Sequence, residues 1–254
     1  MLAAVMPPAA ARGATIVLFV LAAFMIAMHS LLLGLAAQRT SLGARARVAA
    51  PALTAAFLAA WFAVADVVAD QTNFPLTQTG GLLPLSLTVL LVPLVIAVAA
   101  LFASRTMRTI NAAMPSTWLI RLQTYRLAGF IFLFPFLAYG IVPAAFAVTA
   151  AVGDMLTGAL AIPVARLVDR RGAAAFGWAR AWNALGILDL VVVPTVAVLT
   201  GARVIGHYPI GTIALFIGPP LGILTHIYSL RNLAASASSA ARVRPLAVGS
   251  VQHA

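Results

Sequence analysis

Three charged side chains lie well inside long apolar stretches of this sequence, away from the ends of those stretches. Asp154 and Asp189 fall near the middle of two consecutive apolar runs, and Arg126 falls inside the run before them. A charged residue at the centre of a membrane-spanning helix costs about 2.5–3.5 kcal/mol on insertion scales, so such residues pair with one another or carry a function. On antiparallel neighbouring helices both carboxylates would lie at similar depth, where they could share a proton or bind a cation, with Arg126 as the counter-charge. A static ion-pair lock between helices is the alternative.

Polar neighbours extend this candidate site. Gln123 and Tyr125 stand beside Arg126, and Asn183 lies in the same run as Asp189. Side chains with amide and hydroxyl groups form hydrogen bonds between helices inside a membrane. We group all of these residues into one candidate cluster for proton or ion transport.

A second pair of carboxylates lies near one end of an earlier apolar run. Asp66 and Asp70 are four residues apart, so on a helix they share one face. They could form a weak cation mouth at the outer surface. A solvated helix end, where a charge is tolerated cheaply, is the alternative.

Two histidines, His29 and His226, lie in the first and last apolar runs at similar depth. In a closed ring of helices they would be neighbours and could ligate haem or a transition metal. Histidines that only form packing hydrogen bonds are the alternative. Cysteine and glutamate are absent from the sequence, and we expect no metal site and no cofactor.

The composition is that of a membrane protein. The chain of 254 residues is 63% hydrophobic and only 8% charged, whereas soluble domains carry roughly a quarter charged residues. A membrane-spanning helix needs roughly 20 apolar residues, and the runs are too long and too uniformly apolar for barrel strands. We therefore predict an all-α fold, a bundle of seven transmembrane helices over about 14–37, 49–69, 82–104, 119–139, 142–165, 176–199 and 208–230.

The basic residues orient this bundle. All sixteen are arginines, and thirteen of them fall in alternate gaps between the runs or in the tail, against Arg12 and Arg203 on the other side. By the positive-inside rule the N-terminus lies outside and the C-terminus in the cytoplasm. The net charge of +11 does not indicate nucleic-acid binding, because the basic and aromatic residues do not interleave in a patch. Residues 1–232 form the membrane domain, and 233–254, rich in Ala, Ser and Arg, are predicted to be a disordered basic tail in the cytoplasm.

An internal repeat is suggested by an offset of 126 residues. This offset superimposes the first three runs on the last three and aligns Arg45 with Arg171, Pro93 with Pro219 and Arg105 with Arg231. A 3+1+3 arrangement with parallel halves would result, as in some transporters. In a chain so rich in Ala, Leu and Val, chance overlap is the alternative.

Four segments together resemble a family of small uncharacterised bacterial integral membrane proteins. They are QTYR at 123–126, GD at 153–154, WNALGILDL at 182–190 and PPLGILTH at 219–226. The resemblance covers roughly residues 118–232 and implies a multi-pass protein of the bacterial cytoplasmic membrane, without assigning catalytic residues. The 3+1+3 topology is similar to that of SWEET and PQ-loop proteins, but the paired Pro-Gln signature is missing. A retinal protein is excluded because the chain has no lysine.

We expect a translocator of a small solute or ion that uses Asp154, Asp189 and Arg126. The alternative is a non-catalytic sensor or accessory subunit that binds a lipid, haem or a partner helix. An enzyme is not expected, because no nucleophile–base pair or metal constellation is visible. Expected partners are the lipid bilayer and a small solute, proton or cation. An oligomer is possible, and nucleic acid is not expected as a partner.

Overall fold

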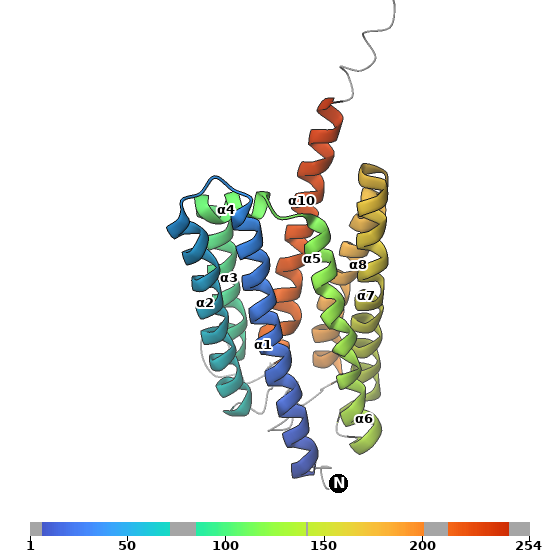
Figure 1. Ribbon diagram of the computed structural model, residues 1–254. Coiled ribbons are helices and arrows are strands. Elements are labelled where there is room, and N and C mark those ends of the chain that lie inside the picture. The colour runs from blue at the N-terminus through green and yellow to red at the C-terminus, as the bar shows by residue number, and fades with distance from the viewer. Residues whose placement is uncertain (1–6, 72–84, 141, 201–212, 244–254) are drawn as a thin grey trace, which may run out of the picture.

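The computed structural model describes residues 7–71, 85–140, 142–200 and 213–243. All regular secondary structure in these ranges is helical, which confirms the predicted all-α class (Figure 1). The helices, in order, are α1 (Pro8–Gln38), α2 (Ala44–Gln71), α3 (Leu85–Ala103), α4 (Arg105–Ala112), α5 (Ser116–Leu122), η1 (Gln123–Phe132), α6 (Leu133–Tyr139), α7 (Ala144–Arg171), η2 (Gly172–Ala175), α8 (Phe176–Leu199), η3 (Ile213–Leu221) and α10 (Gly222–Val243).

Three helical stretches in the described part are long and apolar enough to cross a membrane: Pro8–Gln38, Ala44–Val68 and Ala144–Ala197. The segment Leu91–Ala103 would be a fourth together with Arg105–Ala112, from which it is bent by 80°. The third stretch folds back on itself, because Gly172 has a positive φ of 53° at the end of α7 and α8 then returns alongside it. A glycine adopts this left-handed conformation without steric cost and so ends the helix.

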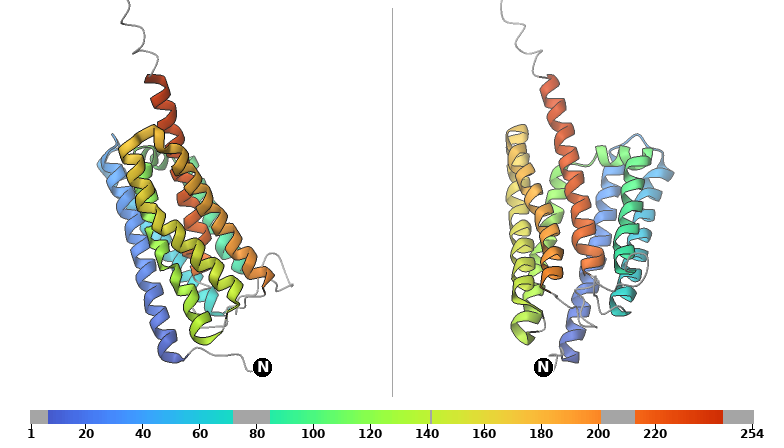
Figure 2. Two further views of the ribbon diagram at one scale, coloured as in Figure 1. Left: turned by 90° about the vertical axis from the view of Figure 1, so that its right-hand side faces the viewer. Right: turned by 180° about the vertical axis from the view of Figure 1, so that it is seen from behind.

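The helices form two groups with shared elements between them. On one side α1, α2 and α3 lie together, on the other α7 and α8, and the rod α5–η1–α6 and helix α10 run between the groups (Figures 1 and 2). Large apolar side chains face outward on all sides, among them Ile16, Val20, Leu53, Leu137, Val152 and Leu188. So many exposed apolar residues are characteristic of a surface covered by lipid rather than by water.

Proline positions shape the packing of α2 against α3. Pro93 lies inside α3 and has no N–H, so the carbonyl of Val89, four residues earlier, lacks its helical partner. The indole Nε1 of Trp61 on α2 donates to that carbonyl at 3.0 Å. Trp61 is buried and also meets the ring of Phe216 edge-on at 5.6 Å. A proline kink is thus repaired by a neighbouring helix, as is usual where water is absent.

Helix α10 differs from the predicted disordered tail. It continues past residue 232 to Val243 and projects beyond the other helices (Figure 1). The extension is rich in alanine, the residue with the highest helix propensity, which explains why the segment is helical without extensive packing. Residues 244–254 of the predicted tail lie outside the described part.

The connector between α3 and the central rod contains a short helix. α4 begins after Ser104, whose side-chain oxygen accepts from the backbone N–H of Met107 at 3.3 Å. This cap satisfies one of the N–H groups left open at the start of a helix. The segment between α3 and α5 is therefore ordered, and it closes one end of the α1–α3 group (Figure 1).

The central rod contains an unusual stretch, η1, in which ten consecutive residues form a 3₁₀-helix. Such runs rarely exceed four residues. Because a 3₁₀-helix has three residues per turn, residues three apart lie in one row along its face. Gln123, Arg126, Gly129 and Phe132 form that row and are all buried. The row packs closely against α7.

Candidate functional site

Arg126 is the centre of the candidate site. It lies midway along η1, is only 2% exposed, and is among the largest fully buried side chains of the described residues. A buried guanidinium needs partners for its N–H groups, because each unpaired polar group in an apolar interior costs free energy. The partners come from three other helices.

Both predicted aspartates bind this guanidinium. Nε donates to Oδ1 of Asp154 on α7 at 2.6 Å, and Nη2 donates to Oδ2 of Asp189 on α8. The side chains of Arg126, Asp154 and Asp189 are 1%, 19% and 8% exposed, so Asp154 is the most accessible of the three. The structure therefore brings together the three charged residues on which the transport hypothesis rests.

The third nitrogen of the guanidinium connects to α10. Nη1 lies 3.3 Å from the carbonyl of Gly186 and 3.2 Å from Nε2 of His226. Since arginine can only donate, Nε2 is the acceptor in this contact, and the proton of the neutral ring is on Nδ1. That nitrogen then donates to Oδ1 of Asn183 at 2.9 Å.

Asn183 completes the network at its other end. Its amide nitrogen donates to the carbonyl of Ala179 at 2.7 Å and to the hydroxyl of Ser229 at 3.1 Å. The ring of Trp182 covers His226, with centroids 5.1 Å apart. We use the name Arg126 cluster for Arg126, Asp154, Asp189, His226 and Asn183, a connected chain of hydrogen bonds that joins η1, α7, α8 and α10.

Glycines make the room for this cluster. A methyl group on Gly153 would overlap the carboxylate of Asp189, and one on Gly129 would overlap the side chain of Asp154. At Gly186 it would overlap His226, and at Gly158 it would lie 2.7 Å from the backbone nitrogen of Leu127. Four positions around one arginine thus have no space for a side chain, so the helices approach until their charged groups meet.

The formal charges of the cluster do not balance. One guanidinium faces two carboxylates, which leaves a net charge of −1 when both are ionised and His226 is neutral. In a low-dielectric interior an uncompensated charge is unfavourable, so a proton or a cation would complete the site. Chemically, the arrangement is suited to holding one exchangeable positive charge.

The remaining predicted residues have separate positions. Gln123 lies in the buried η1 row, one turn before Arg126, and neither polar atom of its side chain has a hydrogen-bond partner among the described residues. Tyr125 points to η3, where its hydroxyl donates to the carbonyl of Ile217 at 3.4 Å. Asp66 lies half-buried on α2, apart from the cluster, and the side chain of Asp70 lies outside the described part.

The two histidines have different environments. His226 belongs to the Arg126 cluster, and both of its ring nitrogens have protein partners. Nδ1 of His29 on α1 donates to the carbonyl of Met25, one turn earlier in its own helix, at 2.7 Å. Within the described ranges no three His, Asp, Glu or Cys side chains come together in a way that could hold a metal ion.

Sequence reasoning missed the roles of His226, Ser229 and the four glycines. The glycines next to Asp154 and near Asp189 are visible in the segments GD and WNALGILD, but only the packing of the helices shows what they make room for. One sequence signal for the shape of η1 was available. Gln123, Arg126, Gly129 and Phe132 are each three residues apart, a spacing that places them on one face of a 3₁₀-helix but not on one face of an α-helix.

The model of a protein family described as a domain of unknown function (DUF8737) matches residues 82–234. The matched region contains every residue of the Arg126 cluster. No curated protein and no solved structure matches the chain.

Proposed function

The chain belongs to the DUF8737 family, a domain of unknown function. For this member we propose a function as a translocator of a small solute or ion, in which the Arg126 cluster holds one proton. The observation that carries the proposal is the unequal count of buried charges, one arginine against two aspartates. A bound proton removes the excess charge and, when released, restores it.

The exposed fractions of Asp154 and Arg126 favour a proton that binds and leaves over a positive charge that is permanently bound. The side chain of Asp154 is 19% exposed, whereas that of Arg126 is 1% exposed. Asp154 is therefore the residue through which we propose that a proton enters the cluster, while the arginine stays in place. Ionisable residues inside membrane spans pair with one another, and in pumps and transporters they mark ion pathways and proton relays.

The membrane arrangement that we propose for this function has seven crossings, with the N-terminus outside a bacterial cytoplasmic membrane. Within the described residues, each of the seven apolar runs overlaps with helix, if α5–η1–α6 counts as one rod and η3–α10 as another. The two halves also pack alike, since α1 lies against α2 and α2 against α3, as α7 lies against α8 and α8 against α10. This correspondence supports a 3+1+3 repeat.

The test measures proton flux through purified protein in liposomes that contain a pH-sensitive dye, under an imposed membrane potential. We expect Asp154→Asn and Asp189→Asn to stay folded, since Arg126 keeps one carboxylate in each, and to lose the flux. Asp169→Asn is the matched control, because Asp169 pairs with Arg121 at an exposed site away from the cluster. Flux in both cluster variants equal to that of the control would refute the proposal.

A second candidate is a non-catalytic sensor or accessory subunit in which the Arg126 cluster is a static lock. The observation that favours it is the complete pairing of the guanidinium, whose three nitrogens all contact protein groups behind glycine walls. In this case the natural protein conducts no protons, and both asparagine variants unfold in detergent more readily than Asp169→Asn.

A further inference from the structure

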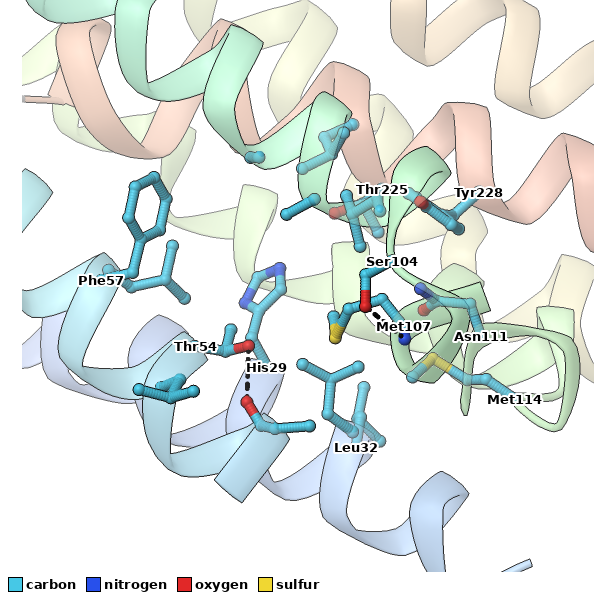
Figure 3. A pocket seen from close by; sticks show the side chains of 18 of the residues that line it. His29, Leu32, Thr54, Phe57, Ser104, Met107, Asn111, Met114, Thr225 and Tyr228 are labelled. Atoms are coloured by element: carbon cyan, nitrogen blue, oxygen red, sulfur yellow. Dashed lines mark hydrogen bonds between the residues drawn. The ribbon is translucent and has the colours of Figure 1, made fainter. Parts of the chain in front are cut away.

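We propose that a cavity between α1, α2, α3, α4, α5 and α10 binds a neutral amphipathic molecule with a hydroxyl-bearing head and an apolar body. The cavity has a volume of about 530 Å³, within the range of small-molecule sites. Its wall is mostly aliphatic and aromatic, and Figure 3 shows the side chains that face it.

Three buried polar atoms without a hydrogen-bond partner among the described residues lie in this apolar wall. One is the hydroxyl of Tyr228, which can donate or accept, and the other two, on Asn111 and His29, each have a single role. Asn111 on α4 is 6% exposed, and its amide nitrogen has no hydrogen-bond partner among the described residues. Nε2 of His29 also lacks a partner. A buried polar group without a partner costs about 1–3 kcal/mol, so these atoms are better explained by a ligand that satisfies them.

The atoms on Asn111 and His29 have opposite hydrogen-bonding roles. Nδ1 of His29 donates to the carbonyl of Met25, so in the neutral ring Nε2 can only accept. The amide nitrogen of Asn111 can only donate. A ligand that suits both must offer a donor and an acceptor, and a hydroxyl group next to a carbonyl or a second hydroxyl provides them.

The absence of charged residues from the lining favours a ligand with a neutral head group. None of the lining residues is Asp, Glu, Lys or Arg. A carboxylate or an ammonium group in this cavity would find no counter-charge among the lining residues, which is unfavourable in a low-dielectric environment. A neutral lipid-like molecule avoids this cost.

The cavity also has a polar and an apolar end. Ser104, Asn111 and Tyr228 lie toward α4, whereas Phe57 lies at the opposite end, with His29 between them (Figure 3). A glycerol ester of a medium-length fatty acid, with its head toward α4, fits this size and polarity.

The cavity and the Arg126 cluster are separate sites. Thr225 lines the cavity, whereas the next residue, His226, faces the cluster. No member of the cluster lines the cavity. The inference therefore stands independently of proton flux, and Asp154→Asn should leave ligand binding unchanged even when it abolishes flux.

The experiment measures saturable binding of radiolabelled 1-monolaurin to the purified chain in lipid nanodiscs, with unlabelled competitor. We expect His29→Leu and Asn111→Leu each to weaken binding about 10-fold, the equivalent of one lost hydrogen bond. Ala97→Leu, which adds bulk on the α3 wall, should weaken binding by a similar factor without removing a polar group. Thr195→Val is the matched control, because Thr195 is exposed on α8 and bonds only its own helix.

Circular dichroism and gel filtration of every variant separate loss of binding from loss of fold. Laurate, the charged analogue, should compete at least about 10-fold less well than monolaurin. Equal competition by laurate, or unchanged binding in His29→Leu, Asn111→Leu and Ala97→Leu, would overturn the proposal. It would likewise be overturned by a dimer in the nanodisc that Ala97→Leu dissociates, because a second copy of the chain would then be the occupant.

Discussion

The substitution Gly186→Ala tests whether the Arg126 cluster depends on its glycine walls. Gly186 lies on α8, and a methyl group there would overlap the imidazole of His226 and come within 3.2 Å of Nη1 of Arg126. Neither side chain can easily retreat. His226 is held by Asn183, and Arg126 is held by both aspartates.

The expected effect is the sum of three contributions. Overpacking of a well-packed site costs about 1–3 kcal/mol. Loss of the contact between Arg126 and His226 costs about 1.5–3 kcal/mol, since the arginine is charged. Alanine gains about 1 kcal/mol over glycine as a helix former. We therefore expect Gly186→Ala to lower the free energy of unfolding by about 1.5–5 kcal/mol.

The assay is unfolding of the purified protein in mild detergent, titrated with a denaturing detergent and followed by circular dichroism. Gly177→Ala is the control on the same helix, because nothing lies within 4 Å of a methyl group at that position. It should be unchanged or more stable by up to about 1 kcal/mol. If both variants unfold at the same point, the glycine does not make room for the cluster and the packing argument fails.

Three further predictions concern other features. Arg126→Lys should destabilise the protein by about 3–5 kcal/mol in the same unfolding assay, because one ammonium nitrogen cannot occupy the positions of the three guanidinium nitrogens that contact Asp154, Asp189 and His226. Stability close to that of the natural protein would contradict this. Trp61→Phe should lower the free energy of unfolding by about 1–3 kcal/mol, because the carbonyl of Val89 loses its donor. Adding Pro93→Ala should recover part of this loss by restoring the helical N–H donor. No recovery would refute the idea that Trp61 compensates for the proline. In this cysteine-free chain, Arg12→Cys should react with an impermeant thiol reagent from the outside and Ser238→Cys from the cytoplasmic side. Labelling of both from the same side would refute an odd number of crossings.

The helices were predictable from the sequence because apolar runs this long have few alternatives. The run over 142–165, for example, contains a single charged residue and becomes the first part of α7. The boundaries were less predictable at the ends that leave the bundle. Helix α10 extends well beyond residue 232 because alanine-rich sequence forms helix without needing an apolar face.

The site was predictable in its charges but not in its geometry. Arg126, Asp154 and Asp189 stood out because charged residues are rare in apolar runs, and the structure places them in direct contact. The link from Arg126 through His226 to Asn183 depends on how α10 packs against α8, which no local pattern encodes. The cavity has even less of a signal, since its wall combines residues from the first five α-helices with residues from η3 and α10 near the other end of the described part.

The 3₁₀ conformation of η1 has a consequence for bilayer thickness. A 3₁₀-helix rises about 2.0 Å per residue and an α-helix about 1.5 Å, so the ten residues of η1 cover about 20 Å where an α-helix would cover about 15 Å. The central rod therefore reaches about 5 Å further than its residue count suggests. Any shift of η1 toward the α form would shorten the rod and turn Arg126 about its axis relative to Gln123 and Gly129. The length of the central rod and the position of Arg126 are thus set by the same hydrogen bonds.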